Sequence, residues 1–99
     1  MHYIMDVEYD SEFKLNLQFE DGAWRMADLK KHLAGEVFEP LRDLSFFRTA
    51  RVNPDVDTVV WDNGADMSPD FLYEISQPLE GRPQLKAAEE QTPYKTSTD

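Results

Sequence analysis

The chain has no cysteine, and this absence excludes disulfide bonds, thiolate metal sites and cysteine nucleophiles. Basic residues are also few, because 10 Lys and Arg stand against 20 Asp and Glu and give a formal net charge of −10 over 99 residues. Such a surface repels phosphate backbones, so direct binding of nucleic acid is disfavoured. Solubility is the simplest explanation of the charge, and the alternative is an acidic surface that meets a basic partner.

Long apolar segments are missing as well. No apolar run approaches the ~18 residues that a membrane span needs, and the start of the sequence has neither the basic nor the apolar region of a signal peptide. Together with the lack of cysteine, this predicts a cytoplasmic protein with no membrane partner. The aromatic content of 12% supplies one modest hydrophobic core, and the length allows one domain.

The sequence contains no motif for catalysis or cofactor binding. The glycines are too scattered for a phosphate loop or a dinucleotide fingerprint, and no Gly-x-Ser-x-Gly sequence occurs. The two histidines, His2 and His32, are isolated, and without cysteine they do not make a zinc site. We therefore predict that the protein is not an enzyme and has no cofactor.

Three carboxylates, Asp62, Asp66 and Asp70, form the sharpest candidate for chemistry. Oxygen ligands around a turn suit calcium or magnesium, but the order Asp-Asn-Gly-Ala-Asp departs from the EF-hand pattern and lacks its bidentate Glu. The structural interpretation is favoured, in which Asp62 and Asn63 build a turn and Asp70 stabilises the start of a helix. An unrecognised metal-dependent enzyme stays open as an alternative.

The first part of the chain predicts strands. Residues 2–7 have apolar side chains on both faces, which favours a strand in the interior of a sheet or one that is covered on both faces, and residues 9–12 are a polar connection. Residues 13–19 alternate apolar and polar side chains without exception, which predicts a strand with one packed and one solvated face. Asp21 and Gly22 then predict a hairpin turn into a short return strand.

A brief helix is expected next. Asp28 is a suitable N-cap, Leu29 and Leu33 have the i, i+4 spacing of one helical face, and Gly35 stands where a C-terminal cap belongs. We expect a further short helical or 3-10 segment near residues 40–46.

The second half of the sheet is predicted from residues 47–52 and 57–61, which form a second hairpin. Asn63 and Gly64 after it favour a tight turn, because both tolerate a positive φ. Ser68 is then a good N-cap and Pro69 suits the first position of a final helix. Strand, turn and capped helix thus follow one another in a short stretch.

These elements predict an α+β fold, with a small antiparallel sheet of about five strands packed by short helices. The sheet consists of two hairpins and an N-terminal strand, and the order of elements is β-β-β-α-β-β-α. The domain is predicted to span residues 1–75. Residues 76–99 contain three prolines and few large apolar residues, which predicts a disordered tail.

Four segments of the sequence together resemble a known family. In chain order they are Phe19-Glu20-Asp21-Gly22, Val37-Phe38-Glu39-Pro40-Leu41-Arg42-Asp43, Val60-Trp61-Asp62-Asn63-Gly64-Ala65-Asp66 and Ser68-Pro69-Asp70-Phe71-Leu72-Tyr73. This series is similar to the small, mostly bacterial family called domain of unknown function 2442, over residues 3–75. The resemblance implies an α+β domain with an antiparallel sheet and supplies no catalytic residues.

The resemblance also bears on partners. Some members of the family are encoded beside another small protein, in an arrangement like toxin–antitoxin pairs. Others resemble proteins with an added helix-turn-helix domain, for which residues 76–99 are too short and too rich in proline. A role linked to DNA is therefore not implied for this chain, whereas a paired protein partner stays open.

We predict a non-enzymatic protein-interaction module that binds another small protein or itself. The alternative is an antitoxin-like regulatory partner of a small neighbouring protein. The predicted interaction surface combines the polar face of residues 13–19 with the turn that follows the last strand: Lys14, Asn16, Gln18, Trp61, Asp62 and Asn63.

Overall fold

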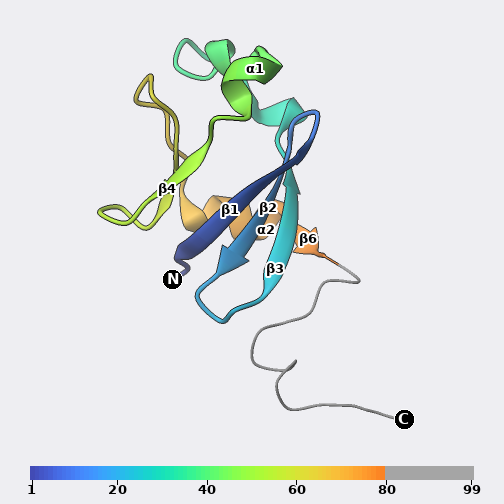
Figure 1. Cartoon of the computed structure of the whole chain (residues 1–99), viewed down its shortest axis with the longest axis vertical. Coiled ribbons are helices and arrows are strands. Elements are labelled where there is room, and N and C mark those ends of the chain that lie inside the picture. Colours follow the sequence, from blue (N-terminus) through green and yellow to red (C-terminus); the bar gives the residue numbers. More distant parts are fainter. Residues whose placement is uncertain (80–99) are drawn as a thin grey trace.

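Two antiparallel sheets form the frame of the protein (Figure 1). The computed structural model describes residues 1–79. The larger sheet has the strand order β1-β2-β3-β6, and the smaller sheet pairs β4 with β5. The strands are β1 (Ile4–Ser11), β2 (Lys14–Phe19), β3 (Trp24–Asp28), β4 (Arg51–Asn53), β5 (Thr58–Val60) and β6 (Gln77–Pro78). The helical elements are the 3-10 turns η1 (Lys30–His32) and η2 (Glu39–Arg42) and the helices α1 (Leu44–Phe47) and α2 (Pro69–Ile75). The predicted α+β class and order of elements are confirmed.

β2 lies between β1 and β3 and defines the two faces of the larger sheet. Because side chains alternate along a strand, the apolar residues of β2 share one face, here called the inner face: Leu15, Leu17 and Phe19. All three are fully buried. The opposite face, here called the outer face, carries the polar residues of the same strand: Lys14, Asn16 and Gln18.

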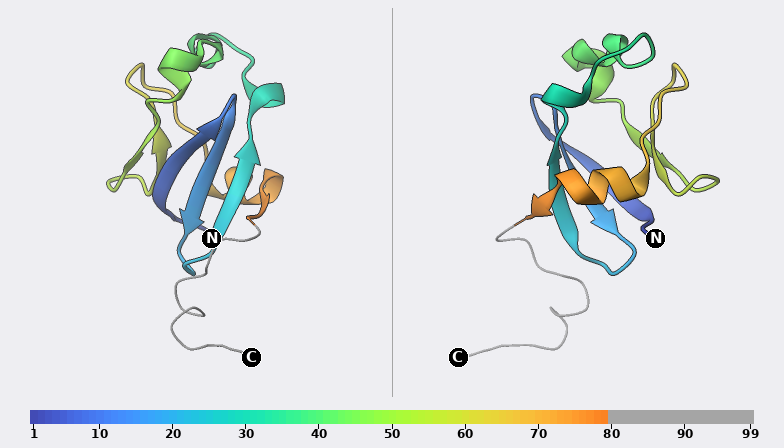
Figure 2. Two further views of the ribbon diagram at one scale, coloured as in Figure 1. Left: turned by 45° about the vertical axis from the view of Figure 1, so that its right-hand side comes forward. Right: turned by 180° about the vertical axis from the view of Figure 1, so that it is seen from behind.

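The hydrophobic core lies on the inner face. Figure 2 shows α2 running across this face, whereas no helix or strand of residues 1–79 covers the outer face. Leu72 of α2, Phe47 of α1 and Val59 of β5 are buried in the core. Trp61, directly after β5, is also buried, and its Nε1–H donates a hydrogen bond of 2.9 Å to the backbone oxygen of Phe47.

The turn and cap residues act as predicted. The Asp21 carboxylate accepts the backbone N–H two residues further on at 2.9 Å, and Gly22 has the positive φ of +85° that the turn requires. Ser68 caps α2, where its hydroxyl accepts the N–H of Phe71 at 3.4 Å and Pro69 takes the first helical position. The local sequence therefore determines both the turn after β2 and the start of α2.

β1 differs from the prediction in extent and position. It spans Ile4–Ser11 instead of residues 2–7, and it lies at the edge of the sheet instead of its interior. Tyr9, predicted in a polar connection, packs against the core, and the real connection is the two-residue turn at Glu12 and Phe13. The polar residues of this segment belong to a strand because one face of an edge strand is open to solvent.

The helix predicted after Asp28 is reduced to η1. β3 extends to Asp28, which pairs with Lys14, and the residue that caps η1 is Leu29 instead of Asp28. The Asp28 carboxylate still accepts the N–H of Lys30 at 3.1 Å. Leu29 and Leu33 are both buried, as their spacing predicted.

The middle of the chain agrees with the prediction in outline. η2 and α1 confirm the helical segment near residues 40–46, and β4 and β5 confirm the second hairpin. The strand expected from residue 47 begins only at Arg51. The reason is local, because Asp43 accepts the N–H of Ser45 at 3.0 Å and starts α1, which extends to Phe47.

The domain boundary predicted at residue 75 lies too early. Ser76 is buried, and its hydroxyl and backbone oxygen accept hydrogen bonds of 2.7 and 2.8 Å from Arg25. β6 then pairs with β3 and places Gln77 opposite Met26. Residues 80–99, the rest of the predicted disordered tail, lie outside the described residues. Within the described chain no helix is long and apolar enough to cross a membrane.

Candidate functional site

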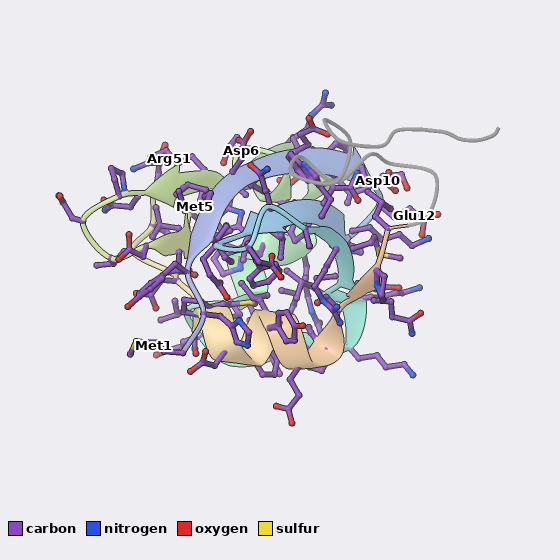
Figure 3. All side chains as sticks on the ribbon, turned by 90° about the horizontal axis from the view of Figure 1, so that it is seen from below. Met1, Met5, Asp6, Asp10, Glu12 and Arg51 are labelled. Atoms are coloured by element: carbon purple, nitrogen blue, oxygen red, sulfur yellow. The ribbon has the colours of Figure 1, made fainter. Side chains whose placement is uncertain are left out.

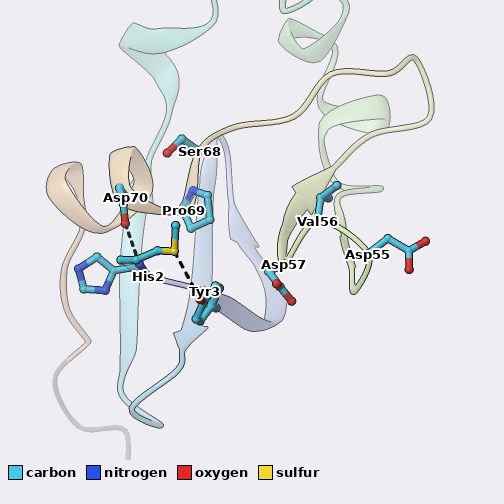
Figure 4. Close-up of a pocket in the computed structure, with 9 residues that line it drawn as sticks. His2, Tyr3, Asp55, Val56, Asp57, Ser68, Pro69 and Asp70 are labelled. Atoms are coloured by element: carbon cyan, nitrogen blue, oxygen red, sulfur yellow. Dashed lines mark hydrogen bonds between the residues drawn. The ribbon is translucent and has the colours of Figure 1, made fainter.

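A pocket of about 350 Å³ opens beside the N-terminal residues (Figure 4). Carboxylates from two elements line it, with Asp55 and Asp57 on the β4–β5 turn and Asp70 on α2. The backbone N–H of His2 donates a hydrogen bond of 2.7 Å to Asp70, and both residues line the pocket. Residues 1–79 contain no group of three His, Cys, Asp or Glu side chains that could hold a metal ion. Asp62, Asp66 and Asp70 are therefore not brought together into such a group.

Glu20 fastens the N-terminal residues to the sheet. Its carboxylate accepts the N–H of Tyr3 at 2.9 Å and pairs with the His2 ring at 3.1 Å. Burial acts to raise the pKa of Glu20, but the backbone hydrogen bonds and the His2 ring outweigh it and lower that pKa. The His2 ring stacks on Tyr73 at 3.8 Å, so these contacts hold the N-terminal residues against α2.

The outer face of the larger sheet is the second candidate. The register places Glu8 and Met26 on either side of Asn16, and Asp6 and Trp24 on either side of Gln18. Figure 3 shows Asp6 and Asp10 on the side of β1 that faces away from α2. Three strands therefore contribute side chains to one surface, and the hydrophobic core lies behind it.

Two apolar side chains lie on this polar surface. Trp24 is 6% exposed and is buried outside the main core cluster, and Met26 beside it is half-buried. A tryptophan on the face opposite the core, next to an accessible methionine, is typical of surfaces that bind proteins. The outer face is thus not an ordinary solvated sheet surface, contrary to the prediction of one wet face.

Asn16 is the most unusual residue of the outer face. It is 8% exposed, and its side-chain oxygen Oδ1 is buried without a hydrogen-bond partner. Its Nδ2–H donates a long hydrogen bond of 3.4 Å to the Asp10 carboxylate. A buried polar atom without a partner costs free energy and is rare in folded proteins. Asn16 is the one such side chain among residues 1–79.

Both edges of the larger sheet are unsuited to adding a strand. β1 has irregular pairing at two places, and the Asp6 carboxylate accepts the N–H of Val7 at 2.8 Å. β6 at the other edge is two residues long and includes Pro78, which has no N–H. Bulges, acidic side chains and proline all protect sheet edges. The outer face, and not an edge, is the surface that this sheet presents.

The six residues of the predicted interaction surface divide into two groups. Lys14, Asn16 and Gln18 lie together on the outer face, as predicted. The prediction is wrong for Trp61, which is a core residue. Asp62 is exposed and pairs with Arg51.

Asn63 has the structural role in the turn that its sequence context predicted. Its side chain accepts the N–H of Ala65 at 3.1 Å and donates to the backbone oxygen of Val37 at 3.0 Å. It therefore fixes the turn after β5, together with Gly64 at φ +89°.

Sequence analysis missed the contributions of β1 and β3 to the outer face. Asp6, Glu8 and Asp10 alternate with Val7 and Tyr9, and this period of two was the available signal. This alternation was not recognised because residues 9–12 were assigned to a polar connection and not to the strand. Trp24 and Met26 gave no signal, because a sequence does not tell which face of a strand packs against the core.

The fold and this surface define a small α+β protein in which α2 covers one face of a four-stranded antiparallel sheet, while none of the helices and strands of residues 1–79 lies on the other face. The chain belongs to the family described as protein of unknown function (DUF2442), whose model matches residues 4–78. The match includes β6. Comparisons with curated proteins and with solved structures found no match.

Proposed function

We propose that this protein is a non-enzymatic, cytoplasmic interaction module that binds another protein through the outer face of its larger sheet. One observation carries the proposal: Trp24, Met26 and the unsatisfied amide of Asn16 share a face that lies opposite the core. Neither apolar side chain belongs to the main core cluster. A partner that covers this face buries the exposed part of Met26 and gives the polar residues new hydrogen bonds.

A second protein is favoured over self-association as the occupant. Asp6, Glu8 and Asp10 are exposed on β1 at the border of this face. A symmetric dimer built on this face brings two copies of the same acidic surface together, and like charges oppose such a contact. The partner is expected to be a different small protein whose surface is complementary to the outer face.

Site-specific photo-crosslinking tests the proposal. Met26 is replaced by p-benzoylphenylalanine in the full-length protein in its native cells, with Glu74 on the exposed side of α2 as the control position. We expect one stoichiometric protein to be crosslinked from position 26 and none from position 74. The same protein should fail to co-purify with Met26→Asp and should co-purify with Glu74→Lys. Equal capture from both positions, or none from either, contradicts the proposal.

An antitoxin-like role is the alternative, and the acidic character of β1 is the observation that favours it. A basic toxin surface is a suitable partner for exposed carboxylates. Co-expression with the neighbouring small protein tests this role. Growth arrest by the neighbour alone, relieved by this chain but not by its Met26→Asp variant, supports it. A neighbour that does not affect growth rules it out.

A further inference from the structure

The outer face is rich in hydrogen-bond acceptors and poor in donors. Asp6, Glu8 and Asp10 extend along β1 on the outer side of the pleat, and Asp28 lies at the end of β3. Lys14, opposite Asp28, is the one cationic side chain that the strands of residues 1–79 place on this face. The local charge is thus strongly negative, in the same sense as the net charge of −10 of the chain.

The amide of Asn16 lies within this acidic group. Its Nδ2–H reaches the Asp10 carboxylate at 3.4 Å, while its Oδ1 has no donor. With 8% of its surface exposed, Asn16 is more than nine-tenths buried, so bulk water does not compensate for the missing donor. The side chains opposite it in the two strand pairs, Glu8 and Met26, are both long and unbranched. Such side chains change rotamer readily when a ligand approaches.

We infer that the outer face takes a cationic protein segment and that one of its arginines donates to both Asn16 Oδ1 and the Asp10 carboxylate. This inference rests on the proposed function and specifies the chemistry of the partner. A guanidinium fits because its planar fork has five N–H donors and no acceptor, and because it is less strongly hydrated than an ammonium. Its aliphatic stem packs on the exposed part of Met26.

A titration with synthetic peptides tests the inference. The full-length, 15N-labelled protein is titrated with a 12-residue peptide of alternating Arg and Ser, and with its Lys and Glu counterparts. We expect the Arg peptide to shift the amide signals of β1, β2 and β3 and the side-chain NH₂ signal of Asn16. The Lys peptide should bind more weakly and the Glu peptide not at all. Affinity should fall as salt rises, because exposed charges are screened.

Matched variants identify the site. Asp6→Asn, Glu8→Gln and Asp10→Asn together remove the charge of β1 but keep acceptor atoms for its local hydrogen bonds. The control combines Glu36→Gln, Asp66→Asn and Glu74→Gln, which remove the same charge from exposed residues outside the larger sheet. We expect the β1 variant to weaken binding of the Arg peptide by about tenfold or more, and the control to change it by less than about threefold.

Asn16→Leu separates the arginine contact from general electrostatic attraction. This variant removes the acceptor but leaves every charge in place, and it should weaken the Arg peptide by about tenfold and the Lys peptide by less. Shifts spread over the whole surface, or equal losses in the β1 and control variants, overturn the inference. Binding of the Glu peptide to the outer face overturns the inference that the partner is cationic, but it supports the proposal that this face binds proteins. Crosslinking from position 26 reports on the proposed function independently of these peptides.

Discussion

Asn16→Leu should make the isolated protein more stable. The buried Oδ1 without a donor costs about 1–3 kcal/mol in the folded state, and the substitution removes this cost. The substitution also removes the hydrogen bond to Asp10, which is 3.4 Å long. Because Asp10 is exposed, water takes the place of this donor, and the loss of the bond costs about 0.5–1 kcal/mol. Leucine has the same number of side-chain heavy atoms as asparagine and the same branching at Cγ, and it packs beside Met26 on the sheet. The balance is a gain of about 1–2 kcal/mol in the free energy of unfolding.

Thermal and urea unfolding of the full-length protein, followed by circular dichroism, measure this gain. For a domain of this size, 1 kcal/mol corresponds to about 4–8 °C in Tm, so a rise of about 4 °C or more is expected. The urea midpoint should rise with an unchanged m-value, because the folded and unfolded states keep their compactness.

Gln18→Leu is the matched control for this experiment. Gln18 lies on the same face of the same strand, is half-buried, and its Nε2–H donates to the backbone oxygen of Gly22 at 3.3 Å. Its replacement removes this hydrogen bond and no unsatisfied buried atom, so it should give no gain and lower stability by about 0.5–1 kcal/mol. A lower Tm for Asn16→Leu refutes the reasoning, since it means that Oδ1 has a donor in solution. The acceptor proposed for an arginine is then already occupied.

Three further predictions follow from the same structure. Trp61→Phe leaves the Phe47 oxygen without its donor and opens a cavity, so it should cost about 2–4 kcal/mol in urea unfolding; an unchanged midpoint contradicts a core role. Ser68→Ala removes the cap of α2 and should lower stability by about 0.5–1 kcal/mol by the same assay, while Ser68→Asp should restore it. Glu20 has a lowered pKa in the folded state, so its contribution to stability is present above the pKa of the unfolded chain and is lost as pH falls through the folded-state value. Unfolding midpoints of the wild type and Glu20→Gln should therefore differ at pH 7 and converge in acid; a difference that is constant with pH contradicts this linkage.

The elements that sequence predicted well are those with local causes. The alternation of β2, the Asp21-Gly22 turn and the Ser68-Pro69 cap each depend on residues close together in the chain. The failed predictions depend on distant partners. β6 exists because it pairs with β3, about fifty residues earlier, and β3 extends to Asp28 because it pairs with β2, so only the short turn η1 follows where a helix was expected.

The candidate site was predicted in part for the same reason. Lys14, Asn16 and Gln18 were found because their own strand alternates, and their place on one face follows from the pleat. Trp61 was placed on the surface because it precedes a polar turn, whereas its indole N–H is bonded inside the core. No local pattern distinguishes these two environments of an aromatic residue.

The sequence by itself determined the α+β class, the acidic charge, the turns, the cap of α2 and the polar character of one face of β2. Only the tertiary structure decided which faces are covered. Helix α2 packs on the inner face, so Trp61 lies in the core and Trp24 lies on the opposite side of the sheet, next to Asn16 and the carboxylates of β1. The physical reason is that hydropathy and turn chemistry act over a few residues. The covering of a face depends instead on the packing of elements that are far apart in the chain.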